Sequence, residues 1–226
     1  MKILISGHLG FIGKKLHEKL PEAIGIDKKD GNDLMVCPLP KDVNLIYHLA
    51  AQAFVEPSWE HPLFTLLNLQ LTARLVHEYP NAKIIYANTS ASKESSPYGF
   101  SKHTSAEYLK AFHKNYVNII LPNVYGKGSG RVVDIFKASD DVIIYGDGKQ
   151  VRDYVHVDDI VDGLLKAKDW EVGDYSMGSE VGTTLLELAE KKNVMFAPAR
   201  REDKECVVKN TTPNWHYKTK VLDYIK

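Results

Sequence analysis

The chain has 226 residues, of which 44% are apolar and 26% are charged, a composition typical of a soluble globular protein. Lysine plus arginine and aspartate plus glutamate both number 29, so the zero net charge gives no reason to expect nucleic acid or an anionic membrane as a partner. No apolar stretch is long enough to span a bilayer and no leader pattern opens the chain, so we expect a cytoplasmic protein. Cys37 and Cys206 lack disulfide or metal-ligand spacing, so we interpret both as free thiols and predict no metal site.

Short apolar runs alternate with amphipathic stretches over the first 122 residues. The runs are too apolar to be half exposed, which favours strands buried on both faces of a parallel sheet. Strict alternation of strand and helix is typical of a doubly wound α/β domain, so we predict a Rossmann-type parallel sheet. The predicted strands are residues 2–6, 23–27, 45–51, 83–90 and 117–123, and the predicted helices are 11–20, 61–79 and 98–115.

The pattern loosens after Pro122. Residues 126–148 are rich in glycine and aspartate, helices are predicted again at 157–168 and 183–192, and the tail from 198 to 226 is polar. We therefore expect a dinucleotide-binding domain at 1–122, to which about 151–170 return, and a small substrate-binding lobe at 123–226.

Three glycines, Gly7, Gly10 and Gly13, follow the first predicted strand and open the first helix. In such a loop the first glycine allows a tight turn, the second lets backbone amides approach a pyrophosphate, and the third lets helix and strand pack closely. The helix N-terminus then faces the phosphates with its partial positive charge. The spacing is not the commoner G-x-G-x-x-G, so a tight turn without a ligand remains the alternative.

Asp27 ends the second predicted strand, where a carboxylate can accept hydrogen bonds from the adenosine ribose. A carboxylate there repels a 2′-phosphate, which favours NAD over NADP. Lys28 and Lys29 beside it leave open the alternative of a solvated loop acid.

Several motifs in order resemble the extended short-chain dehydrogenases/reductases that act on nucleotide sugars, the NAD-dependent epimerase/dehydratase group. They are GHLGFIG from residue 7, NDL from 32, HLAAQA from 48, YANTSAS from 86, PYGFSK from 97, LPNVYGKG from 121 and GDGKQVRDYVHVDDI from 146. The resemblance implies bound NAD. The residues it implies as NAD-binding are Gly7, Gly10, Phe11, Ile12, Gly13, Asp27, Asp33, Leu34, Leu49, Ala50, Ala51, Gln52, Asn68, Tyr98, Lys102 and Pro122.

The resemblance also implies Ser90, Tyr98 and Lys102 as catalytic residues, with Thr89 beside Ser90. Tyr98 and Lys102 lie four apart, so on a helix both project from one face. An ammonium near a phenol lowers the phenol pKa, which makes Tyr98 a candidate general base. Ser90 can hydrogen-bond the substrate oxygen and align it with Tyr98. A tyrosine and a lysine at this spacing are more often an ordinary helix face.

The small lobe is expected to hold the nucleotide of a sugar donor. Arg152 is the candidate for the pyrophosphate, because its planar fork bonds two phosphate oxygens at once, although it could instead pair with Asp153. Arg200 is a weaker candidate for phosphate contact. By resemblance, Asn123 and Ser90 contact the substrate.

Departures from the family pattern bear on the reaction. Ala91 and Ser92 follow Ser90 where dehydratases and decarboxylases of the family usually carry acidic residues, which favours epimerisation. Five residues separate Asp27 from Asp33, too few for the usual helix and third strand, and seven separate Ser90 from Tyr98.

We therefore predict an NAD-dependent nucleotide-sugar epimerase, of the UDP-sugar 4-epimerase type. The alternatives are a dehydratase or reductase of the same family, or a non-catalytic dinucleotide-binding protein. By resemblance, we expect a homodimer in which 61–79 and 98–115 of two chains form a four-helix bundle.

Overall fold

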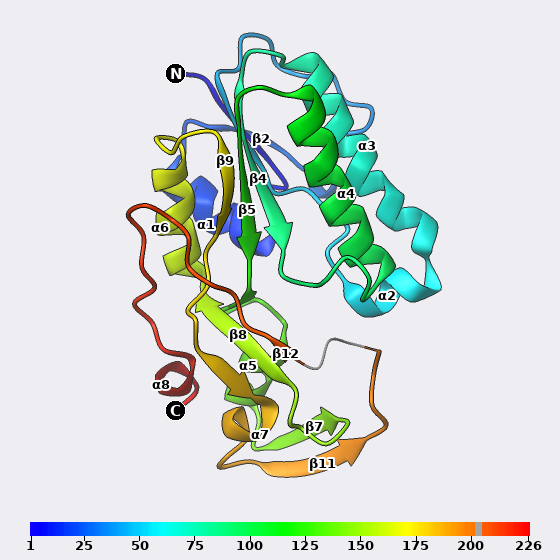
Figure 1. Cartoon of the computed structure of the whole chain (residues 1–226), viewed down its shortest axis with the longest axis vertical. Coiled ribbons are helices and arrows are strands. Elements are labelled where there is room, and N and C mark those ends of the chain that lie inside the picture. The colour runs from blue at the N-terminus through cyan, green and yellow to red at the C-terminus, as the bar shows by residue number, and fades with distance from the viewer. Residues whose placement is uncertain (202–204) are drawn as a thin grey trace.

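The structure, a computed structural model, describes residues 1–201 and 205–226. Its largest element is a six-stranded sheet in the order β2-β1-β3-β4-β5-β9, in which every pair is parallel (Figure 1). This confirms the predicted Rossmann-type fold class. The strands are β1 (Ile3–Ser6), β2 (Ile24–Ile26), β3 (Leu45–His48), β4 (Lys83–Thr89), β5 (Tyr116–Leu121) and β9 (Gly173–Ser176).

Helices cover both faces of this sheet because its strands are apolar on both sides. On one face, Ile3 and Ile5 of β1 share a core with Leu16 of α1 (Phe11–Lys19) and Leu164 of α6 (Val157–Ala167). On the other face, Leu4 shares a second core with residues of α3 (Pro62–Glu78) and α4 (Pro97–Phe112). The short helix α2 (Val55–Glu60) precedes α3. Alternate side chains of one strand thus enter two different cores.

The sheet ends at β2, which is followed by a single 3-10 turn, η1 (Lys28–Asp30). The expectation that the segment is too short for a further helix and strand is confirmed. In their place, Leu34 and Cys37 are buried against the α3 and α4 face. Arg74 of α3 holds this segment by donating to the carbonyls of Leu34 and Cys37.

The small lobe is built around β8 (Val151–His156). Its neighbours are β10 (Gly182–Thr184), β12 (Glu205–Cys206) and β6 (Asn123–Tyr125), while β7 (Asp141–Tyr145) pairs with β11 (Asn193–Ala197). Three short helices complete it: α5 (Val132–Ala138), α7 (Leu185–Leu188) and α8 (Val221–Ile225). The prediction of a helix over 183–192 is wrong except for the single turn α7. Its start is displaced because residues 182–184 pair with β8, and Thr184 then forms a capping box with Glu187.

The chain crosses between the two parts more than once. Of the segment expected to return at about 151–170, β8 lies in the small sheet, whereas α6 and then β9 lie against or within the main sheet. Trp215, from the tail, is 1% exposed and belongs to the main core. Its indole nitrogen donates to the Asp159 carbonyl on α6 at 2.7 Å. Among the residues described, no helix is long and apolar enough to cross a membrane.

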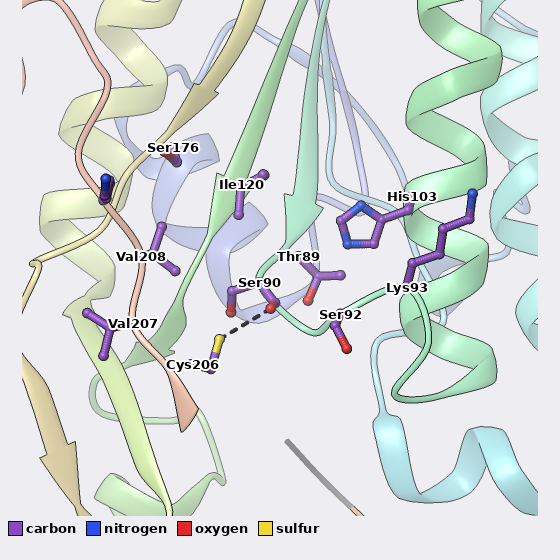
Figure 2. Close-up of a pocket in the computed structure, with 11 residues that line it drawn as sticks. Thr89, Ser90, Ser92, Lys93, His103, Ile120, Ser176, Cys206, Val207 and Val208 are labelled. Atoms are coloured by element: carbon purple, nitrogen blue, oxygen red, sulfur yellow. Dashed lines mark hydrogen bonds between the residues drawn. The ribbon is translucent and has the colours of Figure 1, made fainter. Parts of the chain in front are cut away.

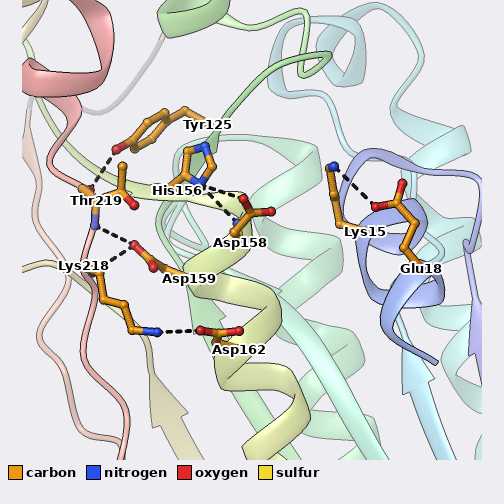
Figure 3. Close-up of polar contacts among 9 residues, drawn as sticks. All are labelled: Lys15, Glu18, Tyr125, His156, Asp158, Asp159, Asp162, Lys218 and Thr219. Atoms are coloured by element: carbon orange, nitrogen blue, oxygen red, sulfur yellow. Dashed lines mark hydrogen bonds and ion pairs between the residues drawn. The ribbon is translucent and has the colours of Figure 1, made fainter.

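A buried carboxylate ties the C-terminal segment to α6. One carboxylate oxygen of Asp159 accepts the backbone amides of Lys218 and Thr219, each at 2.9 Å (Figure 3). The Thr219 carbonyl in turn accepts the Tyr125 hydroxyl at 2.9 Å. The tail is therefore attached to both the main domain and the small lobe.

Candidate active site

The glycine loop between β1 and α1 is pressed against the loop that follows β3. Gly7 has a φ of +78°, and a Cβ on it would come within 2.7 Å of the Ala50 nitrogen. A Cβ on Gly13 would come within 2.0 Å of the Gly7 carbonyl oxygen. Both positions therefore require glycine, one for backbone conformation and the other for close helix packing.

The N-terminus of α1 fits the phosphates of a dinucleotide. Gly10 is the N-cap, no side chain among the described residues caps it, and the first turn carries no acidic residue. A Cβ on Gly10 would meet only the Gly7 carbonyl oxygen, at 3.1 Å, so this face of the loop is open. The amides of Phe11, Ile12 and Gly13 thus remain for an anion, which is the arrangement that pyrophosphate binding uses.

Asp27 lies beside this loop, at the carboxyl end of β2. Its two carboxylate oxygens accept the amides of Leu9 at 3.1 Å and Lys29 at 3.0 Å. Asp33 is different, because it is exposed and its carboxylate accepts the Met35 amide within its own turn, at 2.8 Å. Leu34 is buried in the core. Asp27 thus lies beside the glycine loop, where the ribose ligand is predicted, whereas Asp33 contacts its own turn and Leu34 packs in the core.

The loop after β3 is held in place by Asn68, which is 2% exposed. Its side chain accepts the Gln52 amide at 2.8 Å and donates to the Gln52 carbonyl at 3.2 Å and the Ser101 hydroxyl at 2.9 Å. The strand predicted over 45–51 ends at His48, opposite Ser6, the last residue of β1, and the Ala50 amide donates to the Ser6 hydroxyl at 3.3 Å. The half-buried residues 49–52 instead form a loop at the sheet edge where Pro122, which is buried, follows β5.

Tyr98 and Lys102 stand in the first turns of α4. The Ser96 hydroxyl caps this helix by accepting the Gly99 amide at 3.0 Å. A Cβ on Gly99 would come within 2.2 Å of the Ser92 carbonyl oxygen. The glycine of the P-Y-G sequence therefore allows the loop after β4 to lie directly on the helix that carries Tyr98.

Lys102 is deeply buried, at 3% exposed, and its ammonium lies 4.1 Å from the centre of the Tyr86 ring. Burial lowers the pKa of Lys102 to about 7. Burial, with a smaller contribution from the Lys102 charge, lowers the pKa of His48 to about 3. The neutral His48 ring is hydrogen-bonded to Ser6 at 2.8 Å and Thr72 at 3.1 Å. At neutral pH, Lys102 is therefore present in both its charged and its neutral form.

The pKa of Tyr98 is raised above its usual value because burial disfavours the phenolate. This corrects the expectation that Lys102 gives Tyr98 a lowered pKa. A hydrogen bond from the Thr89 side chain and the charge of Arg131 act in the opposite direction but do not outweigh burial. The hydroxyl that touches Tyr98 is therefore that of Thr89, the last residue of β4, next to the predicted Ser90.

Ser90 faces a pocket of about 420 Å³ (Figure 2). Its amide donates to the Leu121 carbonyl at 3.0 Å, and its carbonyl accepts the Cys206 thiol at 3.2 Å. The pocket is lined by Thr89, Ser90, Ser92, Lys93, His103, Ile120, Ser176, Cys206, Val207, Val208 and Lys209. One wall comes from β4, the loop after it, β5 and α4, and the other from the end of β9, from β12 and from the residues that follow β12.

The tail wall of this pocket is attached to the small sheet by a buried carboxylate. Asp153 is 0% exposed and accepts the Val208 amide at 3.1 Å and the Ser179 hydroxyl at 2.6 Å. The pocket therefore lies where the two parts of the molecule meet.

The profile of the NAD dependent epimerase/dehydratase family matches residues 3–178. The chain belongs to this family. A UDP-glucose 4-epimerase of Mycolicibacterium smegmatis is 28% identical, with 83% of this chain and 80% of that protein covered. UDP-glucuronic acid decarboxylase 1 of Arabidopsis thaliana is 27% identical, with 88% of this chain and 59% of that protein covered. The structure of the UDP-glucose 4-epimerase of Thermotoga maritima, solved with UDP-glucose, matches with a TM-score of 0.84 at 25% identity. The match covers 100% of this chain and 96% of the Thermotoga chain.

Members of this epimerase/dehydratase family depend on NAD, and relatives with this fold have been solved with NAD bound. The open glycine loop and Asp27 fit that cofactor. Among the residues that the structure describes, no group of three or more His, Cys, Asp or Glu side chains is placed to hold a metal ion. Cys37 and Cys206 are both free thiols.

The other residues expected to bind substrate lie around the small sheet. Arg152 on β8 pairs in register with Cys206 on β12, which lines the pocket. Asn123 is exposed and donates to the Asp153 carbonyl at 3.3 Å. Arg200 is exposed and its guanidinium stacks 3.5 Å from the centre of the Tyr145 ring. Asp153, which the sequence offered as an alternative partner for Arg152, accepts hydrogen bonds from Ser179 and Val208. Ser90 is the member of the predicted substrate set that lines the pocket.

Arg131 is a site residue that no sequence motif indicated. It stands at the N-cap of α5 in the small lobe, donates to the Ala53 carbonyl at 3.0 Å and lies 5.2 Å from the centre of the Phe54 ring. It therefore reaches across to the loop that follows β3, and its charge acts on Tyr98. In the sequence it is a single arginine after a glycine-rich stretch, and only the fold brings it to the tyrosine.

Proposed function

We propose that this chain is an NAD-dependent nucleotide-sugar epimerase of the UDP-sugar 4-epimerase type. The observation that carries the proposal is that Tyr98 contacts the Thr89 side chain at the end of β4, with Lys102 buried one turn further along α4, beside a pocket lined by Thr89 and Ser90. A dinucleotide-binding protein without catalysis has no need for a buried lysine, whose desolvation lowers its pKa by disfavouring its charged form.

The side chains in this arrangement can move a proton at a sugar hydroxyl. Bound NAD would supply the hydride acceptor, and then the hydride donor, for oxidation of the sugar carbinol to a ketone and its reduction. Tyr98 takes the hydroxyl proton, and Thr89 and Ser90 align the oxygen with the phenol. Burial favours the phenol form of Tyr98, so Tyr98 must lose its own proton before it can accept that of the sugar hydroxyl, and a positive charge nearby would stabilise the phenolate that results. Gly7, Gly10, Gly13 and Asp27 would hold the dinucleotide, and Arg152 the pyrophosphate of the sugar donor.

The residues after Ser90 favour epimerisation over elimination. Ala91 and Ser92 have no carboxylate that could remove or deliver a second proton. His103 contacts this segment, with its Nε2 3.0 Å from the Ala91 carbonyl oxygen. Two of the relatives named above are UDP-glucose 4-epimerases, which supports the same reaction. The decarboxylase relative makes the distinction an experimental one.

Product mass and cofactor balance test the proposal. Purified protein is incubated with NAD and a panel of UDP-, GDP- and dTDP-sugars. An epimerase gives a product of the same mass as its substrate, without net release of NADH. A product lighter by water or carbon dioxide, or steady NADH release, would contradict epimerisation.

Replacing Tyr98 by Phe separates catalysis from binding. This variant keeps the ring and removes the proton-transferring oxygen, so conversion is expected to fall by about 10²–10⁴-fold while NAD still binds. The matched control is Phe100→Leu, which changes an exposed aromatic side chain two residues further along the same helix and should leave conversion unchanged. Unchanged conversion by the Tyr98→Phe variant would remove Tyr98 from the mechanism.

We also propose that two copies of the chain pair through α3 and α4. Large apolar side chains on these helices are exposed, with Leu63 at 77%, Phe64 at 58% and Phe112 at 64%. Exposed apolar patches of this kind mark interaction surfaces. Sedimentation analysis is expected to give a dimer that Leu63→Glu with Phe112→Glu converts to monomer, while Ile143→Glu in the small lobe leaves it intact. A monomeric parent protein would refute the pairing.

A further inference from the structure

A buried histidine of the glycine loop lies against the outermost strand of the main sheet. His8 is 8% exposed and lies edge-on to His17 of α1, with ring centres 5.2 Å apart. A Cβ on Gly25 of β2 would come within 2.4 Å of the imidazole ring. The histidine therefore occupies space that only a glycine at position 25 leaves free.

Three contacts join the glycine loop to the turn that follows β2. The Leu9 amide donates to Asp27, and the Lys29 ammonium donates to the Leu9 carbonyl at 3.2 Å. The third contact is between His8 Nε2 and a carboxylate oxygen of Asp30, at 3.4 Å. The contacts of Asp27 and Lys29 fix the start and middle of the turn, and the contact of His8 fixes its end.

The charges on this turn have opposite effects on a ribose phosphate. Lys28 and Lys29 would attract a 2′-phosphate, whereas Asp27 and Asp30 would repel it. The Leu9 carbonyl engages the Lys29 ammonium, and His8 holds Asp30 on the side of the turn that faces the glycine loop. The observed arrangement thus keeps both carboxylates beside the loop that fits the dinucleotide.

We propose that His8 is a positioning residue for cofactor choice: by holding Asp30, it fixes the 28–30 turn so that Asp27 and Asp30 face the adenosine ribose and NAD is preferred to NADP. Among the described residues, His8 Nδ1 is buried without a hydrogen-bond partner. Asp30 is therefore the polar group that orients the ring. The inference concerns NAD binding by this family member and is independent of which sugar reaction follows.

Binding of NAD and NADP to the full chain, measured separately by calorimetry without sugar, tests the proposal. His8→Leu keeps the bulk of the ring and removes the contact with Asp30, and Asp30→Asn removes the charge. In both variants the Kd for NAD is expected to rise about three- to tenfold, with a smaller change or an improvement for NADP. His8→Gln retains an N–H that can reach Asp30, so it is expected to restore most of the preference.

His17→Leu is the matched control, because it changes the other ring of the same contact and should leave the ratio of the two Kd values unchanged. If His8→Leu does not fold, Asp30→Asn still decides, since the Asp30 side chain is 34% exposed. A ratio that stays at the parent value in Asp30→Asn, or a His8→Gln variant that behaves as His8→Leu does, would overturn the proposal.

Discussion

The main domain, built on the six-stranded sheet, and the small lobe are each stabilised internally by different interactions. In the main sheet, every residue of β1 and β3 is buried, and apolar side chains fill both faces. The small lobe has short strands with exposed positions, as in the alternating pattern of β7. Buried carboxylates supply much of the long-range order of the small lobe and the tail. Asp153 of β8 and Asp159 of α6 accept backbone amides from residues 26 to 60 positions away.

Because of this difference, one side of the candidate site is held by apolar packing and the other by hydrogen bonds. Tyr98, Thr89 and Lys102 stand on elements of the apolar core, where packing restricts movement. The opposite wall, with Cys206 and Val208, depends on hydrogen bonds to Asp153. We infer that packing holds the candidate catalytic side chains rigidly. The pocket wall opposite them is held by a few polar contacts, which single substitutions can remove.

The largest effect is expected from the glycine loop. Gly13→Ala places a Cβ 2.0 Å from the Gly7 carbonyl oxygen and should disrupt both NAD binding and the packing of α1. Gly10→Ala meets only one atom, at 3.1 Å, so the fold should survive while NAD affinity falls at least about tenfold. Circular dichroism and calorimetry separate the two outcomes. Full NAD affinity in Gly10→Ala would show that this face of the loop does not contact the cofactor.

Lys102→Met is expected to reduce sugar conversion by about 10²-fold or more while stabilising the ligand-free protein. The pKa of Lys102 is lowered from 10.5 to about 7, so burial of the charge destabilises the fold as pH falls from 10.5 and the cost is complete below about pH 7. The gain in unfolding free energy, on the order of 2 kcal/mol, is therefore largest near pH 7 or below and vanishes near pH 11.

Lys110→Met on the same helix is the control for this gain. Burial lowers the pKa of Lys110, but Asp174, 2.7 Å away, and Glu107 raise it overall. Its loss should therefore leave stability unchanged or slightly lower, and conversion intact. Thermal unfolding as a function of pH measures both variants. A Lys102→Met variant less stable than the parent at pH 7 would contradict the assigned burial cost.

Two aspartates on α6 compare buried and exposed contacts to the tail. Asp159, 4% exposed, accepts two backbone amides, whereas Asp162 pairs with the exposed Lys218 ammonium (Figure 3). Asp159→Ala is expected to cost about 1–3 kcal/mol because two partly buried backbone amides lose their acceptor. Asp162→Ala should cost at most about 1 kcal/mol. Denaturant unfolding measures both, and equal losses would show that the tail is not held by Asp159.

The sequence predicted the main sheet better than the small lobe for a physical reason. Apolar runs such as residues 84–87 (I-I-Y-A) lie in strands that are mostly buried on both faces, so local pattern and final environment agree. In the small lobe, residues 183–192 have a helical pattern but partly pair with β8, because a long-range strand partner outweighs local preference.

The site divides in the same way. Tyr98, Lys102 and the glycines could be placed because short motifs hold them at fixed spacings. The Thr89 contact and Arg131 depend on how β4 ends and on where α5 begins, which one-dimensional spacing does not determine. The direction of the Tyr98 pKa shift was predicted wrongly because desolvation depends on the packed surroundings of the phenol.

The smallest effect tests whether the small lobe contributes to the chemistry as well as to binding. Burial raises the pKa of Tyr98, and the Arg131 charge lowers it in part, so Arg131→Gln should raise it further. A general base acts in its deprotonated form, so the rise of conversion rate with pH should move to higher pH. Below that pKa the rate should fall by about two- to fivefold. Arg201→Gln is the control, because Arg201 also reaches across to the main domain but stacks on Trp59, 5.3 Å from the ring centre. If both variants keep the parent pH profile, Arg131 only joins the two parts of the molecule. If only Arg131→Gln shifts the profile, a residue of the small lobe adjusts the pKa of Tyr98 in the main domain.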